Sequence, residues 1–500
     1  MKLLSCICIG IIAALMLVHS IGTAEDTVFS NETVDCGEVE VYNLSFATNT
    51  SNASISLTGE PIMMIPEDET FSHGNGEGTS TLIGIDETDI ELQVAETTRV
   101  SVRTNGKQGD SESYVPSISP DGRYVTFESL ATNLVNGDKN GAYDIFVHDY
   151  KTGKTARVSV RTNGKQGNGH SYDPSISSAG RYVAFESTAT NLVNGDTNGV
   201  EDIFVHDQQT GETRRVSVRT NGAEGNGNSY YPSISSAGRY VAFESEATNL
   251  VNGDTNGAFD IFIHDRETGK TERVSVRTNG VQGDAGSYLP SISSDGRYVA
   301  FESDATNLVN KDTNGVFDIF IHDRETGKTE RVSVKTNGVE GDAGSNNPSI
   351  SSAGRYVAFE SYAANLVNGD TNGASDIFIH DRQTGETRRV SVRTNGAQGD
   401  GNSYYPSISS DGRYVAFYSY ATNLANGDTN GASDVFVHDR QTGETRRVSV
   451  RTNGKQGDYY SYYPSISSDG RYVAFDSLAT NLVNKDTNGA RDIFVAELST

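Results

Sequence analysis

The stretch that decides the fold is PSISSDGRYVAFES, from Pro290 to Ser303, followed by NLVNKDTNGVFDIFIHD, from Asn307 to Asp323. The same text returns with small changes every 58 residues along most of the chain. A fixed period of this length indicates a repeat architecture, because each copy is one supersecondary unit. The Arg-Tyr-Val core of the copies begins at Arg123, Arg181, Arg239, Arg297, Arg355, Arg413 and Arg471.

Each copy holds four short runs with strand character, which in the copy quoted above are PSIS, RYVAFES, DIFIHD and TERVSV. They are rich in β-branched and aromatic residues and are separated by turn signals such as SDG. In a strand, Tyr298 and Ala300 point to one face and Val299 and Phe301 to the other, so both faces carry apolar residues. Stacked four-stranded sheets would cover both faces, which is the arrangement of propeller blades.

The two ends of the repeat region predict how the ring closes. The first repeat element is RVSV at Arg99, a fourth strand with no blade before it, and the last copy stops after its third strand. We therefore predict an all-β, seven-bladed β-propeller of 58-residue repeats. Strand 97–102 is expected to complete the last blade beside residues 492–495, with essentially no helix beyond residue 97.

The repeat resembles the TolB-type propeller repeat, a relative of WD40 repeats, whose motif reads roughly P-x-x-SPDG-x-x-[IV]-x-[FY]. PSISPDGRYVTF, from Pro116 to Phe127, is similar to it, and the resemblance covers about residues 97–500. It implies a β-propeller. TolB proteins have six blades and a separate N-terminal domain, so their partner-binding function is not carried over to this chain.

Residues 1–24 have the features of a signal peptide: Lys2, an apolar run from Leu3 to Val18, and Gly22-Thr23-Ala24 as a small-residue cleavage site. The apolar run is shorter than a bilayer-spanning helix needs. We expect a secreted or cell-surface protein. Only Cys36 remains after cleavage, so disulfides within the chain are not expected to hold the fold.

Residues 25–96 carry 16 acidic residues and no Lys or Arg. This segment is either a small β module or a loosely ordered acidic spacer. It also contains the glycosylation sequons at Asn31, Asn43, Asn49 and Asn52. Residues 97–500 form the predicted propeller. A net charge of −26 argues against nucleic acid and anionic membranes as partners and favours cations or basic partners.

The motif that most resembles a ligand site is N-x-D-x-N-G-x-x-D, between the second and third strands of every repeat. Oxygen-bearing residues at positions 1, 3 and 5, glycine at 6 and an acid at 9 resemble the calcium loops of integrin α-subunit propellers, with Asn for Asp at positions 1 and 5. Two carboxylates per loop predict weak Ca²⁺ binding. The residues are Asn136, Asp138, Asn140, Asp144, Asn194, Asp196, Asn198, Asp202, Asn252, Asp254, Asn256, Asp260, Asn310, Asp312, Asn314, Asp318, Asn368, Asp370, Asn372, Asp376, Asn426, Asp428, Asn430, Asp434, Asn484, Asp486, Asn488 and Asp492.

The alternative interpretation of these loops is a plain hydrogen-bonded turn, because turns favour the same residue types. The recurring histidine of DIFVHD, such as His264, occurs once per blade and is expected to be packed within a strand rather than to bind metal. No catalytic motif is present, and near-identical blades present the same group seven times. We therefore predict that the protein is not an enzyme.

In a four-stranded meander, the calcium-like loops and the loops between blades lie at the same end. The latter are where the copies differ most, and they hold Tyr230, Tyr231, Tyr404, Tyr405, Tyr459, Tyr460, Tyr462 and Tyr463. Tyrosine suits interfaces, although these side chains could instead wedge between blades. The sequence favours a binding scaffold for a protein or glycan at the cell surface. The alternatives are an enzyme using the channel, such as a lyase or lactonase, and a structural surface-layer component.

Overall fold

The computed structural model describes residues 43–49, 52–58 and 94–499. The first two ranges form a hairpin of β1 (Asn43–Asn49) and β2 (Asn52–Thr58), paired in antiparallel register from Asn43↔Thr58 to Asn49↔Asn52. The predicted signal peptide, Cys36 and the sequon at Asn31 lie outside the described residues. Among the described residues, no helix is long and apolar enough to span a membrane.

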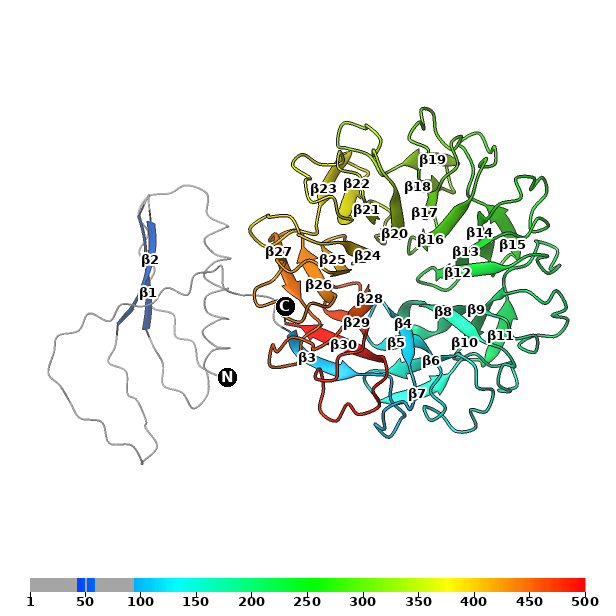
Figure 1. Ribbon diagram of the computed structural model, residues 1–500, viewed down its shortest axis with the longest axis horizontal. Helices are drawn as coiled ribbons and strands as arrows, with labels where there is room; N and C mark the ends of the chain where they lie inside the picture. The colour runs from blue at the N-terminus through cyan, green and yellow to red at the C-terminus, as the bar shows by residue number, and fades with distance from the viewer. Residues whose placement is uncertain (1–42, 50–51, 59–93, 500) are drawn as a thin grey trace. The chain divides into compact units, whose positions relative to one another are not determined.

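Residues 94–499 form seven four-stranded antiparallel sheets, so the prediction of a seven-bladed, all-β propeller is confirmed. Figure 1 shows the sheets as blades around a common centre, with the first strand of each blade innermost. Residues of these innermost strands line a central cavity, which we call the channel. The innermost strands are β4 (Ser113–Ile118), β8 (Ser171–Ile176), β12 (Ser229–Ile234), β16 (Ser287–Ile292), β20 (Ser345–Ile350), β24 (Ser403–Ile408) and β28 (Ser461–Ile466).

The second and third strands form the middle of each blade, paired residue by residue. The second strands are β5 (Tyr124–Ser129), β9 (Tyr182–Ser187), β13 (Tyr240–Ser245), β17 (Tyr298–Ser303), β21 (Tyr356–Ser361), β25 (Tyr414–Ser419) and β29 (Tyr472–Ser477). The third strands are β6 (Asp144–Asp149), β10 (Asp202–Asp207), β14 (Asp260–Asp265), β18 (Asp318–Asp323), β22 (Asp376–Asp381), β26 (Asp434–Asp439) and β30 (Asp492–Leu498).

The outermost strands end at the arginine of the RVSV element, earlier than predicted. They are β7 (Lys154–Arg157), β11 (Glu212–Arg215), β15 (Lys270–Arg273), β19 (Lys328–Arg331), β23 (Glu386–Arg389), β27 (Glu444–Arg447) and β3 (Val94–Arg99). All of them except β3 are therefore shorter than predicted. After the arginine the backbone turns: Val276 N donates to Val274 O at 2.8 Å. The turn ends the strand ladder. The described residues contain one helical element, the 3₁₀ turn η2 (Ser178–Gly180).

The ring closes as predicted, because β3 completes the sheet β28-β29-β30-β3. β3 pairs antiparallel with β30, with Thr97 opposite Ala496 and Arg99 opposite Phe494. It begins at Val94, three residues before the predicted boundary. We number the blades 1 to 7 in the order of their innermost strands, from β4 to β28. Blade 7 is therefore built from both ends of the repeat region.

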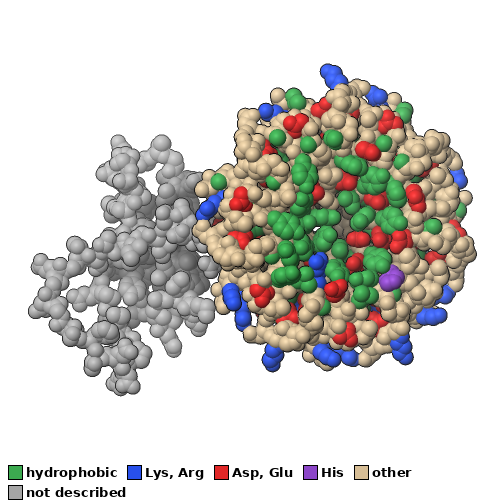
Figure 2. All heavy atoms as spheres, in the orientation of Figure 1, with side chains coloured by type: hydrophobic (Ala, Val, Ile, Leu, Met, Phe, Trp, Pro, Cys, Tyr) green, Lys and Arg blue, Asp and Glu red, His purple; other side chains and the backbone are tan. Residues whose placement is uncertain are grey.

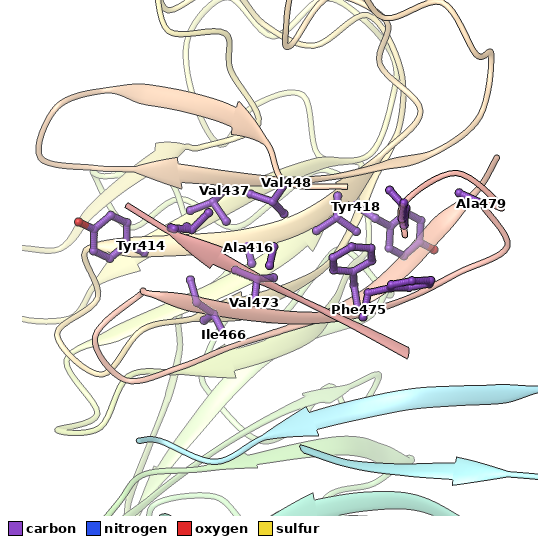
Figure 3. Close-up of a cluster of buried hydrophobic side chains, with 14 residues drawn as sticks. Tyr414, Ala416, Tyr418, Val437, Val448, Ile466, Val473, Phe475 and Ala479 are labelled. Carbon is purple, nitrogen blue, oxygen red and sulfur yellow. The ribbon is translucent and has the colours of Figure 1, made fainter. Parts of the chain in front are cut away.

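The apolar core lies between blades rather than within them. Val299 and Phe301 of β17 pack on Ile261 and Ile263 of the preceding blade, while Ala300 packs in the next cluster with Phe359 of the following blade. The predicted alternation of the two faces is therefore confirmed. Figure 3 shows the cluster between blades 6 and 7, where Val437 and Val448 lie opposite Val473 and Phe475. No blade can bury both of its faces without its neighbours.

Candidate functional site

The loops predicted to bind calcium are built around an arginine. In blade 3, Arg273 Nη1 lies 3.3 Å from Asp254 Oδ1 and 3.1 Å from Asp260 Oδ2. Asp260 is fully buried, and Ser275 Oγ donates to its Oδ1 at 2.6 Å. Gln282 Nε2 donates to both carboxylates at 2.8 Å. A guanidinium thus holds the two carboxylates that were predicted to face a metal.

The two asparagines of the loop make hydrogen bonds typical of a turn. Asn256 Nδ2 donates to Gly283 O at 3.1 Å, and its Oδ1 accepts from Ala258 N at 3.1 Å. The side chain of Arg219 donates to Asn252 Oδ1. The amide oxygens that would serve as calcium ligands therefore already accept hydrogen bonds from the protein.

All seven blades repeat this arrangement, which we call the outer loop cluster. The structure brings the predicted loop residues of each blade together, as expected, and adds an arginine that the sequence analysis treated only as strand. The invariant first letter of RVSV was the available signal. The arginines and their aspartates are Arg99 with Asp486 and Asp492, Arg157 with Asp138 and Asp144, Arg215 with Asp196 and Asp202, Arg273 with Asp254 and Asp260, Arg331 with Asp312 and Asp318, Arg389 with Asp370 and Asp376, and Arg447 with Asp428 and Asp434.

Blades 2 and 4 add a third carboxylate to their outer loop clusters, Glu224 and Glu340, and those of blade 4 lie closest together. Oxygens of Asp312, Asp318 and Glu340 lie within 4.8 Å of one another, which makes them a candidate metal-binding group. Burial raises the pKa of Asp312 to about 6. Arg331 is also inside this group, with Nη2 2.8 Å from Glu340 Oε2 and Nη1 2.9 Å from Asp318 Oδ2. Any cation bound here would share the carboxylates with the guanidinium.

The recurring strand histidines are packed, as predicted. His264 is 6% exposed, and its Nδ1 lies 2.9 Å from Thr271 Oγ1 in the neighbouring strand. Burial lowers the pKa of His264 to about 4, so the ring is neutral at physiological pH. Each of the six histidines lies in its own blade, and they do not converge.

A second region lies at the channel, where each innermost strand places one residue with a left-handed backbone. These residues have φ between 47° and 51°, although none is glycine, and such strain is typical of functional sites. Six of them line a cavity of about 260 Å³, those of blades 1 to 6. Their side chains are of five types in the seven blades. The residues are Val115, Asp173, Tyr231, Leu289, Asn347, Tyr405 and Tyr463.

Buried carboxylates of the second strands hold this strained ring. Leu289 N, for example, donates to Glu244 Oε2 of the preceding blade at 2.8 Å. Burial raises the pKa of Glu244 and Glu302 to about 7 and that of Glu128 to about 8. This carboxylate ring was not predicted from the sequence. It comprises Glu128, Glu186, Glu244, Glu302, Glu360 and Asp476, with Tyr418 at the seventh position. The signal was the acid that recurs before the last serine of the second strand.

Aromatic side chains surround the mouth of the channel. Tyr230, Phe259, Tyr288 and Phe317 form a chain of ring contacts with centroids 5.9, 5.6 and 5.9 Å apart. They alternate between the innermost strand and the residue that precedes the third strand. Figure 2 shows hydrophobic side chains gathered around the central hollow, with acidic side chains among them. We call this the channel face.

Blades 5 to 7 contribute the largest aromatic group of the channel face. Tyr405 and Tyr463 have ring centroids 4.7 Å apart, and Tyr418 and Tyr462 5.2 Å. Four members are more than a third exposed: Tyr362 (48%), Tyr405 (37%), Tyr420 (42%) and Tyr459 (50%). This tyrosine cluster consists of Tyr362, Tyr404, Tyr405, Tyr418, Tyr420, Tyr459, Tyr460, Tyr462 and Tyr463.

Six of the eight tyrosines singled out in the sequence therefore belong to one cluster. Tyr230 stacks elsewhere on Phe259, and Tyr231 lines the channel. Tyr362, Tyr418 and Tyr420 were missed, because they lie in or after second strands rather than in the loops between blades. Tyr418 is the buried member, at 9% exposure, and wedges among the others.

No protein-family model and no curated protein matches the chain. Solved structures do. An oligogalacturonate lyase in complex with manganese is 14% identical, with a TM-score of 0.49, and the match covers 82% of this chain and 96% of that one. TolB from Acinetobacter baumannii is 16% identical, with a TM-score of 0.36, covering 68% and 66%. The propeller domain of the Trilobed protease from Pyrococcus furiosus is 14% identical, with a TM-score of 0.46, covering 78% and 95%.

At these identities the likeness concerns the fold alone. The similar structures include two TolB proteins, in agreement with the resemblance of the repeat. They also include enzymes of unrelated chemistry, such as the lyase and prolyl endopeptidases. The function of this chain therefore has to be argued from its own residues.

Proposed function

We propose that the protein is a secreted or cell-surface binding scaffold whose protein or glycan partner docks on the channel face. The observation that carries this proposal is the tyrosine cluster, nine tyrosines linked in a network of ring contacts and hydrogen bonds, with four of them well exposed. Tyrosine gives a large, rigid contact area with a polar tip, at low cost in side-chain entropy. A contiguous exposed aromatic patch on a soluble fold is typical of an interaction surface.

The test is capture of the partner from the native cell surface with the full propeller as bait. Replacing Tyr362, Tyr420 and Tyr459 together by serine should abolish capture without changing the melting temperature, because all three side chains are exposed. The matched control replaces Val281 and Val339 by serine. These two valines are equally exposed but lie in loops away from the cluster. Undiminished capture by the tyrosine variant would refute the proposal.

Calcium is the ligand we propose for the blade 4 loop, where three carboxylates meet. Hard cations of this kind prefer carboxylate and carbonyl oxygens. Calcium there must compete with Arg331, whose guanidinium contacts all three carboxylates. The other loops predicted to bind calcium face the same competition from their own arginines. We therefore propose weak binding, with blade 4 the most favourable of the loops.

An enzyme using the channel is the second candidate, favoured by one observation. Asp173 is the single acid among the seven strained channel residues, so it breaks the repeat pattern. Burial raises the pKa of Asp173 and of nearby Glu186, as suits a general acid. Turnover of an oligosaccharide that is lost on Asp173→Asn, while partner capture is retained, would favour this candidate over the scaffold.

A further inference from the structure

In blade 7, two tyrosines and a buried aspartate of the channel face hold an arginine side chain. In blade 7, the guanidinium of Arg491 lies between two tyrosines, with its carbon 4.8 Å from the ring centroid of Tyr114 and 4.8 Å from that of Tyr462. Its Nη1 is 3.4 Å from Oδ1 of the fully buried Asp476. Asp476 Oδ2 in turn accepts from Val115 N, at 3.3 Å. The slot is a tyrosine pair with a buried carboxylate beneath it.

Blade 2 has the same slot without its cation. Tyr172 and Tyr230 stand at the positions of Tyr462 and Tyr114, and Glu186 stands at the position of Asp476. Glu186 Oε2 accepts from Tyr231 N at 3.0 Å, the bond that corresponds to Val115 and Asp476. Glu201 takes the place of Arg491. The slot therefore keeps its tyrosines and its buried acid but has an acid where blade 7 has its arginine.

The other blades do not present this combination. The position of Arg491 and Glu201 is uncharged in the remaining five copies, which carry Tyr143, Phe259, Phe317, Ser375 and Ser433. The aromatic residues at this position fill their slots by ring contacts, as Phe259 does between Tyr230 and Tyr288. Blade 2 is thus the one copy in which the repeat adds negative charge to the slot.

The charge at the blade 2 slot is not compensated within the described residues. No Lys, Arg or His nitrogen of residues 94–499 lies within 4.0 Å of Asp173, Glu186 or Glu201. Burial and mutual repulsion raise the pKa of Asp173 and Glu186. Residues 25–96 contain no Lys or Arg either. Buried carboxylates are expensive without a cation or a proton, and an external cation would replace the proton that these raised pKa values favour.

We propose that the blade 2 slot binds the guanidinium group of a ligand, held between Tyr172 and Tyr230 and paired with Glu186 and Glu201, as Arg491 is held in blade 7. This inference rests on the proposed function, because it takes the channel face as the docking surface and assigns the partner an exposed arginine side chain. Guanidinium stacks on aromatic faces and pairs with carboxylates in a fixed planar geometry, whereas ammonium is a compact, strongly hydrated charge.

The experiment is calorimetric titration of the full chain with N-acetyl-arginine amide at millimolar concentration. N-acetyl-citrulline amide is the neutral isostere, and N-acetyl-lysine amide tests the cation type. We expect arginine amide to bind at one site, at least about tenfold more tightly than citrulline amide. Equal binding of the two, or no heat from either, would overturn the proposal.

Two variants place the site. Glu201→Arg supplies the guanidinium from the chain itself, so it should abolish binding, and Glu201→Gln should weaken it. Glu386→Arg is the control, because it makes the same change of charge on the outermost strand of blade 5, where Glu386 pairs with the exposed Arg388. Thermal melts report whether each variant folds. If Glu201→Arg melts normally and still binds arginine amide as the wild type does, the slot is not the site.

A variant of blade 7 tests the proposal even if Glu201→Arg does not fold. Arg491→Glu converts the blade 7 slot to the blade 2 sequence and should add a second site for arginine amide. An unchanged stoichiometry in a folded Arg491→Glu protein would contradict the proposal.

Partner capture with these variants distinguishes the proposed function from the guanidinium slot. It also distinguishes an arginine of a protein partner from a free guanidinium compound as the natural ligand. If the captured partner is a protein with an essential arginine, Glu201→Arg lowers capture. If the natural ligand is a free guanidinium compound, capture is unchanged while titration is lost. If the tyrosine cluster variant still captures and titration also persists, the proposed function fails while this inference stands.

Discussion

The outer loop clusters and the channel face are built from the same repeats but have opposite properties. Every outer loop cluster keeps its arginine, its two aspartates and its hydrogen-bonding serine, and the guanidinium lies against both carboxylates. On the channel face, the residue at the strained position changes from Val115 to Asp173 to Tyr231 in successive blades. Its carboxylate ring has a partner cation among the described residues at Asp476 alone.

The difference separates what maintains the ring from what distinguishes its blades. A contact needed by every blade is kept in every copy, and the outer loop clusters fix the turn between second and third strands seven times. On a rigid scaffold, the residues that bind partners usually lie at the positions that vary. The channel face also places carboxylates where they lower stability, which natural proteins tolerate at functional sites. Four experiments test this division, from the largest expected effect to the smallest.

Ring closure is expected to matter most. Deleting residues 1–103 removes β3 and leaves β30 with an unpaired edge. It also removes the hydrogen bond from Ser101 Oγ to Asp492 Oδ1. An exposed, flat strand edge promotes aggregation. We expect the melting temperature to fall by at least about 10 °C and the protein to aggregate in size-exclusion chromatography. Deleting residues 1–86, which leaves β3 in place, is the control; equal melting of the two would contradict closure by β3.

Arg273→Gln tests an outer loop cluster. It removes the cation between Asp254 and the fully buried Asp260. Breaking a buried ion pair should cost about 3 kcal/mol in the free energy of unfolding, measured by chemical denaturation. Arg214→Gln is the matched control, because the Arg214 side chain is 60% exposed and its pair with Glu212 should contribute less than about 1 kcal/mol. Equal effects would show that the outer loop clusters are not structural.

Glu244→Gln should act in the opposite direction. Burial raises the pKa of Glu244 from 4.5 in the unfolded chain to about 7. Its contribution to stability is therefore full below pH 4.5 and is lost as the pH rises through about 7. The glutamine keeps an acceptor for Leu289 N without the charge. We expect the variant to be more stable than the wild type at pH 8, by about 2 kcal/mol, and equal to it near pH 4.

The pH profile of the wild type supplies the check on this prediction. Denaturation midpoints should fall between about pH 5 and pH 8, and the fall should be shallower in Glu244→Gln. A profile that rises with pH over this range would mean that the carboxylate ring is ionised and compensated.

Calcium should give the smallest effect. Arg331→Gln removes the guanidinium from Asp312, Asp318 and Glu340, which leaves three carboxylates free for a metal. At a tenfold excess over Kd, calcium should then stabilise the variant by about 1.4 kcal/mol, and the wild type by less. The control is Arg389→Gln, whose loop has Gln398 in place of the third carboxylate. If thermal melts with calcium and with chelator agree for all three proteins, the loops are turns.

Much of the fold was predictable, because it depends on local, periodic information. The 58-residue period and the alternation around Phe301 led to the blades, and the early RVSV at Arg99 led to the closing strand. The fourth strand was predicted too long, because Ser275 and its equivalents turn toward a buried aspartate instead of extending the ladder. The Val-Ser-Val run has strand character, so it gives no signal of this turn.

The candidate sites were less predictable, because they join residues far apart in the chain. The loop residues around Asp254 were identified, but Arg273 was not, since its partners come from the preceding loop. Glu244 in a strand whose neighbours are apolar is indistinguishable from a solvent-facing acid until the strand is placed beside the channel. Tyr418 and Tyr420 were missed for the same reason.

The sequence by itself determined the seven blades, the strand order and the phase of closure, because strand periodicity and turn chemistry act over a few residues and recur seven times. Only the tertiary structure decided what the repeats enclose. Closing the ring brings Tyr114 of the first blade beside Tyr462 of the last, with Arg491 between them, across some 350 residues of chain. It also turns one acid per second strand toward a common channel. Burial and proximity of charge, which set the chemistry of that channel, depend on three-dimensional distance rather than on position along the chain.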